Sequence, residues 1–349
     1  MPNKLEPNQL LVKNMVATIC GSDLHTWRGR RSAHVPLVLG HEGMGKIIGM
    51  GEPTLPQRKA LKIGDRVTWS IFDRCFHCMP CTAFNIPQKC DNLFKYGHTS
   101  LEKGNGLDGC YSSHTLVRGG THVVSIPDCI SNQLAAPLNC AFSTIHAALD
   151  LKKFPEDTHF DTALVLGAGL LGLYTCIVLR HLFNVSKVFI TDKNPEREQM
   201  ATKFGAIPVP SLETDSQGFI QKFNTSFIQQ QTKHGVDIVV ETCGDPEAVP
   251  DGIHLLRFGG HFVMVGLVHP KSSLGSLTGY EIIHKCATIH GIHNYGPEHL
   301  DRSISFLSSV VDQYPFHELV SAPLPLSAMD EAFDLAASQK WSRVCVDLE

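Results

Sequence analysis

The first part of the chain, up to about residue 140, consists of short apolar runs separated by turn residues. The runs LLVKNMVATI, GKIIGM and DRVTWSI are typical of strands. Gly and Pro at residues 51–53 and Gly-Asp at residues 64–65 mark turns between these runs. We therefore predict an irregular, mostly β domain for this part of the chain.

From about residue 161 onward, apolar runs alternate with helical patterns. The strand-like runs DTALVLG, KVFITD, VDIVVET and HFVMVGLV are separated by the helical stretches LLGLYTCIVLRHLF, PEREQMATKFG and EAVPDGIHLLRFGG. Such alternation is typical of a parallel sheet with helical crossovers, so we predict an α/β fold here. Two more helices, PEHLDRSISFLSSVVDQ and SAMDEAFDLAAS, and a strand, WSRVCVDL, follow near the C-terminus.

The composition narrows the range of functions. A length of 349 residues suits two domains, and a net charge of −4 gives no reason to expect nucleic-acid binding. No apolar run is long enough to span a bilayer, and the N-terminal stretch MPNKLEPNQLLVKN lacks the apolar core of a signal peptide. We expect a cytoplasmic protein that binds neither nucleic acid nor membranes. In that compartment twelve cysteines serve metal binding or catalysis rather than disulfides.

A glycine-rich turn between a predicted strand and a predicted helix indicates a nucleotide site. Its glycines allow a tight turn, close approach of a pyrophosphate and close helix packing, and the helix start offers amide donors to the phosphates. Asp192 ends the next strand, where a carboxylate binds ribose hydroxyls and repels the 2′-phosphate of NADP, so we predict NAD. A Rossmann-like domain without a cofactor is the alternative. The residues expected to contact the dinucleotide in this turn are Gly167, Gly169, Leu170, Leu171 and Gly172.

Four closely spaced cysteines predict a structural zinc site. Four thiolates at this spacing are enough for a closed tetrahedral site, which ties down a loop that has little core of its own. An iron–sulfur cluster and unmodified thiols are the alternatives, although iron–sulfur motifs usually space the fourth cysteine differently. The cysteines are Cys75, Cys78, Cys81 and Cys90.

Three other segments carry residues that could bind a metal ion. They are CGSDLH at residues 20–25, LGHEG at 39–43 and PLNCAFS at 137–143. Each is common in isolation, since a single buried cysteine is more often part of a core than a ligand. Together with the four-cysteine loop and the glycine-rich turn, and in this order along the chain, they resemble the medium-chain, zinc-dependent alcohol dehydrogenases. The resemblance runs from about Leu10 to the C-terminus.

The resemblance implies a particular domain organisation. Residues 1–141 and 293–349 would form a GroES-like, mostly β catalytic domain that carries both zinc sites. Residues 142–292 would form a Rossmann domain with a doubly wound parallel sheet that binds NAD. The resemblance also implies a small alcohol as the substrate and a homodimer or homotetramer as the assembly.

The resemblance further assigns roles around a catalytic zinc. Cys20, His41 and Cys140 would hold the ion and leave a fourth position for water or substrate. Glu42 would be able to approach the metal and help exchange the fourth ligand. Asp23 would orient His41 through its second ring nitrogen.

A proton relay and a cofactor contact follow from the same resemblance. Ser22 would take the proton from the substrate hydroxyl, and His25 would pass it to solvent by way of the nicotinamide ribose. The alkoxide carbon would give its hydride to NAD. Arg197 lies where the family often has a basic residue near the adenosine ribose.

Arg31 departs from the family pattern. The interval from Cys20 to His41 matches the family without a gap, and Arg31 falls where members usually have an apolar residue lining the substrate pocket. A buried arginine needs an anionic partner, because its desolvation is otherwise unfavourable. The segments GRRSAHVP, GLVHP and HGIHNYGPEHL also resemble a branch associated with phosphonate breakdown. A small hydroxyalkylphosphonate is therefore the leading substrate hypothesis.

Other functions fit parts of the pattern. A polyol or amino-alcohol dehydrogenase, similar to sorbitol or threonine dehydrogenases, is one, although polyol-type members place an acid where Cys140 sits. A non-catalytic or quinone-reductase-like member is another, and the intact metal-ligand segments and Ser22 argue against it. The remaining cysteines are expected to be core thiols; they are Cys110, Cys129, Cys176, Cys243, Cys286 and Cys345.

Overall fold

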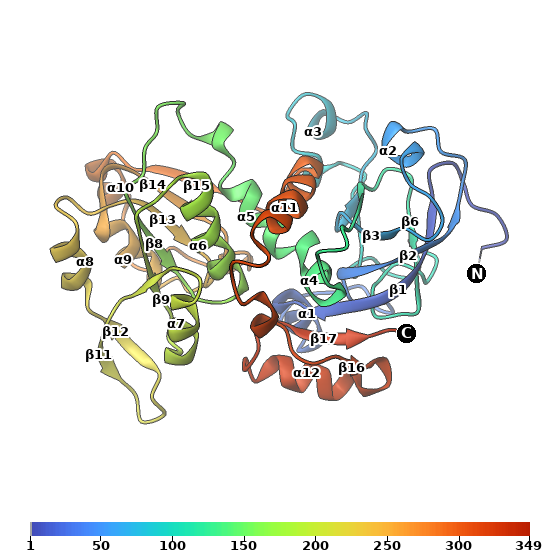
Figure 1. The fold of residues 1–349 in the computed structure, drawn as a ribbon. Coiled ribbons are helices and arrows are strands. Elements are labelled where there is room, and N and C mark those ends of the chain that lie inside the picture. The colour runs from blue at the N-terminus through green and yellow to red at the C-terminus, as the bar shows by residue number, and fades with distance from the viewer. Residues whose placement is uncertain (1) are drawn as a thin grey trace. The chain divides into compact units, whose positions relative to one another are not determined.

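The strand-like runs of the N-terminal part form a seven-stranded sheet in the computed structural model, which describes residues 2–349 (Figure 1). The order is β16-β17-β1-β2-β3-β7, and β6 also pairs with β1. The described pairs are antiparallel except β16 with β17. The strands are β1 Leu10–Ile19, β2 Glu42–Met50, β3 Arg66–Trp69, β6 His114–Val117, β7 Val123–Ser125, β16 Leu324–Pro325 and β17 Val344–Asp347.

This sheet closes over an apolar core. Leu10, Val12 and Ile47 point into it from β1 and β2, and Trp69 fills it from β3. Each large apolar side chain buried in this way stabilises the fold by roughly 1.5–3 kcal/mol. The C-terminal strand contributes Val346, so the two ends of the chain share one core.

The register of β1 and β2 places the first candidate site. Thr18 in β1 lies opposite Glu42 in β2, so Cys20 and His41, just beyond these two residues, lie at the same end of the sheet. The helix α1 starts directly after Cys20.

The helices of this unit are α1 Gly21–Trp27, α2 Pro56–Lys59, α3 Met79–Thr82, α4 Asn132–Ala135, α11 Pro297–Val310 and α12 Met329–Ala337. A short pair, β4 Phe72–Asp73 and β5 Phe94–Lys95, and the 3₁₀ turns Pro87–Lys89, Ala136–Asn139, Phe316–Leu319 and Leu326–Ala328 complete it.

A second sheet forms from the alternating pattern and is parallel throughout. Its order is β10-β9-β8-β13-β14-β15, which in chain order reads 3-2-1-4-5-6, the order of the dinucleotide-binding Rossmann fold. In Figure 1, α6 and α9 lie on opposite sides of these strands. The strands are β8 Thr162–Leu166, β9 Lys187–Thr191, β10 Ile207–Pro208, β13 Val236–Glu241, β14 Leu256–Met264 and β15 Thr288–Gly291.

The helices that accompany these strands are α5 Ala141–Ala148, α6 Leu170–Leu182, α7 Pro195–Thr202, α8 Thr225–Gln231, α9 Ala248–Leu255 and α10 Gly279–Lys285, with a 3₁₀ turn at Leu151–Lys153. The sequence analysis predicted α6, α7 and α9 but not α5, α8 and α10. A hairpin of β11 Ser211–Thr214 and β12 Ile220–Phe223 lies between β10 and α8 and was not predicted. Its β11 residues are all exposed, so no apolar alternation indicates the strand.

One predicted boundary is wrong. The stretch EAVPDGIHLLRFGG was expected to be helical, but α9 ends at Leu255 and β14 begins at Leu256. Leu256 pairs with Val236, and His261 pairs with Ile238, so the residues between them form a bulge. Gly259 has a φ of +68° there, a conformation that favours glycine.

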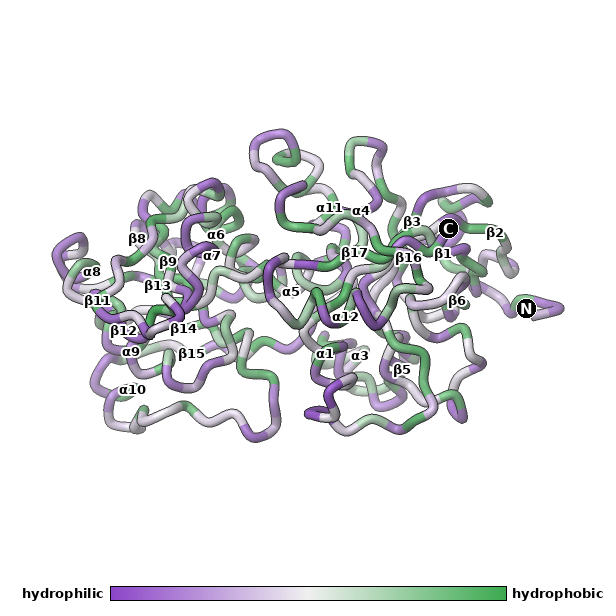
Figure 2. The backbone as a smooth tube through the Cα atoms, turned by 90° about the horizontal axis from the view of Figure 1, so that it is seen from below, coloured by the Kyte–Doolittle hydropathy of each residue, from purple (hydrophilic) through white to green (hydrophobic). Residues whose placement is uncertain are grey.

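The chain divides into two compact units that match these two sheets. One unit runs up to Ser143 and resumes at Asn294–Glu349, and the other is Thr144–His293. The predicted fold class, a mostly β domain plus a doubly wound parallel-sheet domain, is confirmed. In Figure 2 many loop residues, including those near the N-terminus, are coloured hydrophilic. Within residues 2–349, none of the helices has the length and apolar character that crossing a bilayer requires.

Candidate functional site

The three ligand segments converge in the first unit. Cys20 caps the start of α1, His41 directly precedes β2, and Cys140 follows the 3₁₀ turn Ala136–Asn139. One ligand atom from each of these residues and from Glu42 lies within 4.8 Å of the others. Asn139 ties two segments together, because its side-chain amide donates to the His41 carbonyl at 3.0 Å. Two sulfurs and one imidazole nitrogen at this separation fit a catalytic zinc site.

Asp23 fixes the orientation of the His41 ring. The Asp23 Oδ1 and His41 Nδ1 atoms are 3.2 Å apart, and both side chains are buried. The other oxygen, Oδ2, accepts the Cys20 backbone N–H and the Tyr111 hydroxyl, both at 3.0 Å. Burial alone would lower the pKa of His41, but the Asp23 carboxylate outweighs it and raises this pKa to about 10. Because Asp23 contacts Nδ1, Nε2 is the ring nitrogen available to a metal ion.

The pKa values of Cys20 and Cys140 are shifted in opposite directions. A hydrogen bond with the Cys140 thiol and the charge of Arg343 hold the pKa of Cys20 well below its usual range, despite burial. The same interaction raises the pKa of Cys140. A bound divalent cation would favour the thiolate form of both residues.

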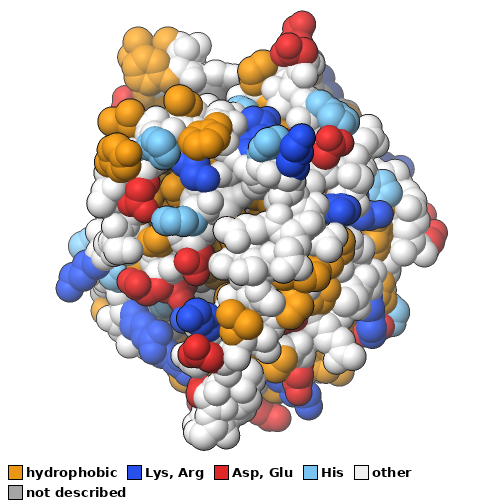
Figure 3. Space-filling view, turned by 90° about the vertical axis from the view of Figure 1, so that its left-hand side faces the viewer, with side chains coloured by type: hydrophobic (Ala, Val, Ile, Leu, Met, Phe, Trp, Pro, Cys, Tyr) orange, Lys and Arg blue, Asp and Glu red, His pale blue; other side chains and the backbone are white. Residues whose placement is uncertain are grey.

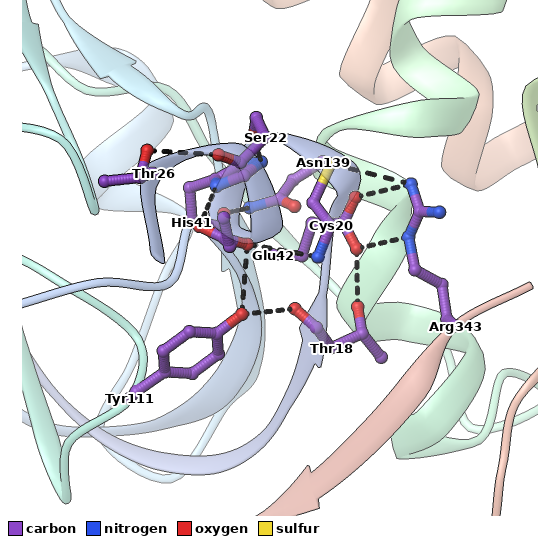
Figure 4. A network of polar contacts seen from close by, with 10 residues as sticks. Thr18, Cys20, Ser22, Thr26, His41, Glu42, Tyr111, Asn139 and Arg343 are labelled. Atoms are coloured by element: carbon purple, nitrogen blue, oxygen red, sulfur yellow. Dashed lines mark hydrogen bonds and ion pairs between the residues drawn. The ribbon is translucent and has the colours of Figure 1, made fainter. Parts of the chain in front are cut away.

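Glu42 is held by a partner that the sequence analysis did not identify. Arg343 in the turn before β17 donates to both carboxylate oxygens, at 2.7 and 2.9 Å, and Thr18 donates to Oε2 at 2.7 Å (Figure 4). Arg343 Nη2 also lies 3.7 Å from Cys20 Sγ. Burial raises the pKa of Glu42 to about 7, although Arg343 opposes that shift. No local motif indicates this contact, because Arg343 and Glu42 are 301 residues apart in the chain.

The two residues predicted to relay the proton, Ser22 and His25, both lie on α1 but differ in exposure. Ser22 is half-buried, and its Oγ lies 3.5 Å from His41 Nε2, the atom available to a metal (Figure 4). Its hydroxyl is therefore beside the candidate zinc position. His25 lies about one turn further along the helix, on an exposed part of the chain.

The four-cysteine loop forms a second compact cluster of thiols. One sulfur from each residue lies within 4.8 Å of the others, and the Sγ atoms of Cys78 and Cys90 are 3.8 Å apart. Zn–S bonds of about 2.3 Å in a tetrahedron give a sulfur–sulfur edge of about 3.8 Å, so the spacing fits zinc. Hydrogen bonds from the backbone, led by that of His77, lower the pKa of Cys75 to about 6. Burial raises the pKa of Cys90 to about 12.

The glycine-rich turn joins β8 to α6 in the second unit. Gly167 has a φ of +104°, and a Cβ there would lie 2.9 Å from the Cys243 side chain. A Cβ at Gly172 would lie 1.8 Å from the Gly167 carbonyl oxygen, so only glycine allows this approach of helix to turn. A Cβ at Gly169, which caps α6, would meet open space. The turn thus leaves room beside the start of α6, where backbone amides attract phosphates.

Asp192 stands next to this turn. Its Oδ2 accepts the Ala168 backbone N–H at 2.7 Å, and its Oδ1 accepts the Asn194 N–H at 2.9 Å. The carboxylate therefore lies between the end of β9 and the glycine-rich turn. Arg197 is half-exposed near the start of α7. Glu198 is buried, and its Oε1 accepts the Asp192 N–H at 3.0 Å.

Arg31 lies just beyond α1 and is half-buried, whereas Arg28 and Arg30 are exposed. Its backbone N–H donates to the His25 carbonyl at 3.1 Å. Arg31 lies within electrostatic range of Lys95 and His98, two residues that the sequence analysis did not single out. The sequence KYGH carries no motif that would have identified them.

The prediction that the six remaining cysteines are core thiols is correct for three of them and wrong for the other three. Cys110, Cys176 and Cys345 are buried thiols, as expected. The other three lie on the surface because they occupy loops and helix ends rather than core positions; they are Cys129, Cys243 and Cys286.

Two family models match the chain. The alcohol dehydrogenase GroES-like domain matches residues 6–128, which contain Cys20, His41 and the four-cysteine loop. The zinc-binding dehydrogenase model matches residues 171–309, which contain most of the parallel sheet.

Individual proteins resemble the chain over nearly its whole length. The L-threonine 3-dehydrogenase of Alteromonas mediterranea is 28% identical over 350 residues, covering 97% of this chain and 92% of the relative. An alcohol dehydrogenase structure from Thermotoga maritima has a TM-score of 0.88 and 28% identity, covering 99% of this chain and 93% of that one. An Escherichia coli alcohol dehydrogenase solved with NADH shares the fold, with a TM-score of 0.78, 24% identity and coverage of 98% and 93%.

Both family models, the full-length relatives and the two clusters of metal-binding side chains point to the same conclusion. The chain belongs to the medium-chain, zinc-dependent alcohol dehydrogenase family, whose members are oxidoreductases that act on CH–OH groups with zinc and a nicotinamide cofactor.

Proposed function

We propose that the protein is a zinc- and NAD-dependent dehydrogenase whose substrate is a small hydroxyalkylphosphonate. The observation that carries the dehydrogenase assignment is the convergence of Cys20, His41 and Cys140 around a ligand position that the Ser22 hydroxyl also adjoins. The half-buried Arg31 supports an anionic substrate.

The chain's own residues supply two metal sites. Cys20, His41 and Cys140 would hold a catalytic zinc, which lowers the pKa of a bound hydroxyl group. The structural zinc would be held by Cys75, Cys78, Cys81 and Cys90, and it would contribute folding energy to a loop whose neighbouring side chains Phe76 and Met79 are exposed.

The residues around the catalytic ligands have separate roles in the reaction. Asp23 holds His41 in one orientation through the 3.2 Å contact. Ser22 accepts the proton of the substrate hydroxyl, and His25, on the exposed part of α1, passes it to solvent. Glu42 would assist exchange of the fourth metal ligand, and Arg343 balances the charge of Glu42.

The second unit provides the cofactor site. The amides at the start of α6, at residues 169–172, would bind the pyrophosphate of NAD, which accepts the hydride. Asp192 would bind the adenosine ribose hydroxyls, with Arg197 nearby. A carboxylate at this position disfavours the additional phosphate of NADP.

A second candidate function is supported by the relatives. The curated relatives named L-threonine 3-dehydrogenase match over almost the full chain, so an amino alcohol or polyol is the competing substrate class. Threonine carries a carboxylate, which Arg31 could bind, and an ammonium group, which needs an acceptor. Asp23 and Glu42 at the ligand set are bonded to His41 and Arg343, so neither is open to that ammonium group, and this favours the phosphonate.

A substrate screen that follows NADH absorbance tests the proposal. 2-Hydroxyethylphosphonate, L-threonine, 2,3-butanediol and 1-propanol would be compared, with the Cys20→Ser variant as the inactive control. We expect the highest kcat/KM for the phosphonate. A higher value for threonine would replace the phosphonate assignment by the amino-alcohol one. No NAD-linked turnover of any alcohol would refute the dehydrogenase assignment itself.

We also propose that the protein works in the cytoplasm as a homodimer or homotetramer. Strand β15 is an edge strand with partly exposed residues, and Tyr280 and Ile283 on the neighbouring helix α10 are 71% and 76% exposed. Figure 3 shows hydrophobic side chains among charged ones on the face of the molecule on the left of Figure 1. Light scattering of the wild type and Ile283→Asp tests the assembly, and a monomeric wild type would refute it.

A further inference from the structure

A turn of unassigned function packs against the metal-binding segment. The residues from Lys95 to Leu101 run along residues 36–41: Leu101 N–H donates to the Pro36 carbonyl at 2.9 Å, and Leu37 bridges to Ser100. Gly97 lies so close to Gly40 that a Cβ would be 2.5 Å from the Gly40 oxygen. The backbone of this turn is therefore held beside the segment that carries His41.

His98 touches the catalytic ligand set directly. Its ring lies 5.0 Å from the His41 ring, and ligand atoms of His98, His41 and Asp23 lie within 4.8 Å of one another. His98 is half-buried. The turn is closed by the His98 N–H, which donates to the Lys95 carbonyl at 3.2 Å. His98 thus links the position of Lys95 to the metal centre.

Two cations lie within electrostatic range of His98. Lys95 is half-buried at the end of β5, and Arg31 is half-buried beyond α1. Burial, and then the charge of Arg31, lower the pKa of Lys95 to about 8. Across residues 2–349, no carboxylate forms an ion pair with either group. Two partly desolvated cations without a counter-ion are unfavourable unless a ligand supplies one.

The negative groups within range of Lys95 do not remove this imbalance. They are Cys140 and Cys20, whose thiolates would be neutralised by the zinc ion that they are arranged to hold. Lys89, also within range, adds positive charge. With the metal site filled, the region beside it remains positive.

We infer that Arg31 and Lys95 form an anion-binding site beside the catalytic ligand set, which binds the tetrahedral oxyanion of a substrate whose hydroxyl group lies at Cys20, His41 and Cys140. The inference rests on the proposed function and makes Lys95 a specificity-determining residue. A phosphonate dianion offers three oxygens and enough charge for two cations, through paired hydrogen bonds from Arg31 and a point charge from Lys95. An ammonium group on the substrate would be repelled.

The test measures binding of methylphosphonate, which has no hydroxyl group to oxidise, to the zinc-loaded enzyme with NAD by isothermal titration calorimetry. Lys95→Met and Arg31→Leu should each raise Kd by about 30-fold or more, since loss of one partner of a desolvated charge pair has effects of that order. Lys95→Arg should stay near the wild type. Lys103→Met and Arg30→Leu, at exposed positions, are the matched controls and should bind normally.

Turnover of 1-propanol and the other alcohols of the screen distinguishes failure of this inference from failure of the proposed dehydrogenase function. The control Lys103→Met should keep that turnover within a few-fold of the wild type, and melting curves should show that Lys95→Met is folded. Normal methylphosphonate binding by a folded Lys95→Met variant would overturn the inference. Loss of binding in the two matched controls as well would overturn it too, because the effect would then be general charge rather than a site. If the wild type bound methylphosphonate but showed no NAD-linked turnover of any alcohol in the screen, the dehydrogenase function would be refuted and the anion site would stand.

Discussion

Arg343 and Glu42 form a buried, two-point ion pair, with N–O distances of 2.7 and 2.9 Å. The pair joins the C-terminal end of the chain to the start of β2, where the metal-binding histidine lies. Glu42 is fully buried, and Thr18 satisfies one further acceptor site. The positive charge of Arg343 therefore balances the negative charge of Glu42 next to the ligand set, and no cation from solvent is needed.

Removing one partner of this pair should be strongly destabilising. Arg343→Met leaves a buried carboxylate without its cation, and such changes typically lower the free energy of unfolding by about 3–5 kcal/mol. Urea unfolding of the zinc-loaded protein measures the effect. The double variant Arg343→Met/Glu42→Gln should recover much of the loss, because the unpaired charge is then absent. Equal stability of the single and double variants would contradict this account.

The two metal sites should respond differently to the loss of one cysteine. Cys20→Ser should remove activity and one of two bound zinc ions while the protein stays folded, because its surroundings are held by the sheet register. Cys90→Ser should lower the melting temperature, because a structural site contributes folding energy directly. Zinc content by atomic absorption and melting curves check both. Two zinc ions and full activity in both variants would show the assignment to be wrong.

Asp192 should determine the choice of dinucleotide. Its carboxylate beside the glycine-rich turn disfavours a 2′-phosphate, so kcat/KM should be higher with NAD than with NADP. Asp192→Ala should narrow that difference, by about tenfold if about 1.4 kcal/mol of discrimination is lost. Asp215→Ala, on the exposed hairpin, is a control that should leave the ratio unchanged. Equal use of both cofactors by the wild type would refute the prediction.

The parts of the site that could be predicted are those encoded in short segments. Cys20, Ser22 and Asp23 come from one helix start, and the glycine-rich turn lies within six residues, so their spacing in the sequence carries their geometry. Strands β8, β9, β13 and β14 and helices α6, α7 and α9 likewise follow from local alternation of apolar runs.

The parts that could not be predicted depend on contacts between distant segments. Arg343 reaches Glu42 across most of the chain, and Lys95 and His98 reach the ligand set because Gly97 packs on Gly40. The early start of β14 at Leu256 was missed because the RFGG bulge interrupts the apolar pattern of the strand. Tertiary pairing, rather than local sequence, decides each of these cases.

Ser22 and His25 should contribute unequally to turnover. Ser22→Ala removes the hydroxyl beside His41 Nε2 and should lower kcat by about 10²–10⁴-fold, the usual range for a group that transfers a proton. NAD binding, followed by fluorescence, should be preserved. His25→Gln should have a smaller effect, because water can replace the last member of a relay near the surface. Normal turnover by Ser22→Ala would remove this residue from the mechanism.

Glu198 should make the stability of the second unit depend on pH. Burial, together with the charge of Asp192, raises its pKa from 4.5 to about 7. A carboxyl group with a raised pKa in the folded state binds its proton more tightly there than in the unfolded chain. Its contribution to stability is therefore present below pH 4.5, falls as pH rises from 4.5 to 7, and is constant above that range.

The Glu198→Gln variant isolates this contribution. Glutamine keeps the oxygen that accepts the Asp192 N–H but carries no charge, so the variant should match the wild type near pH 4.5. At pH 8 it should be more stable by about 1 kcal/mol, a value reduced from the full pKa shift to allow for solvent screening. Urea unfolding at the two pH values measures the difference. Glu196→Gln is the matched control on the same helix, and because Glu196 is exposed at the start of α7, its neutralisation should give no gain at pH 8. A Glu198→Gln variant with the same pH dependence as the wild type would show that the ionisation of this side chain does not limit stability.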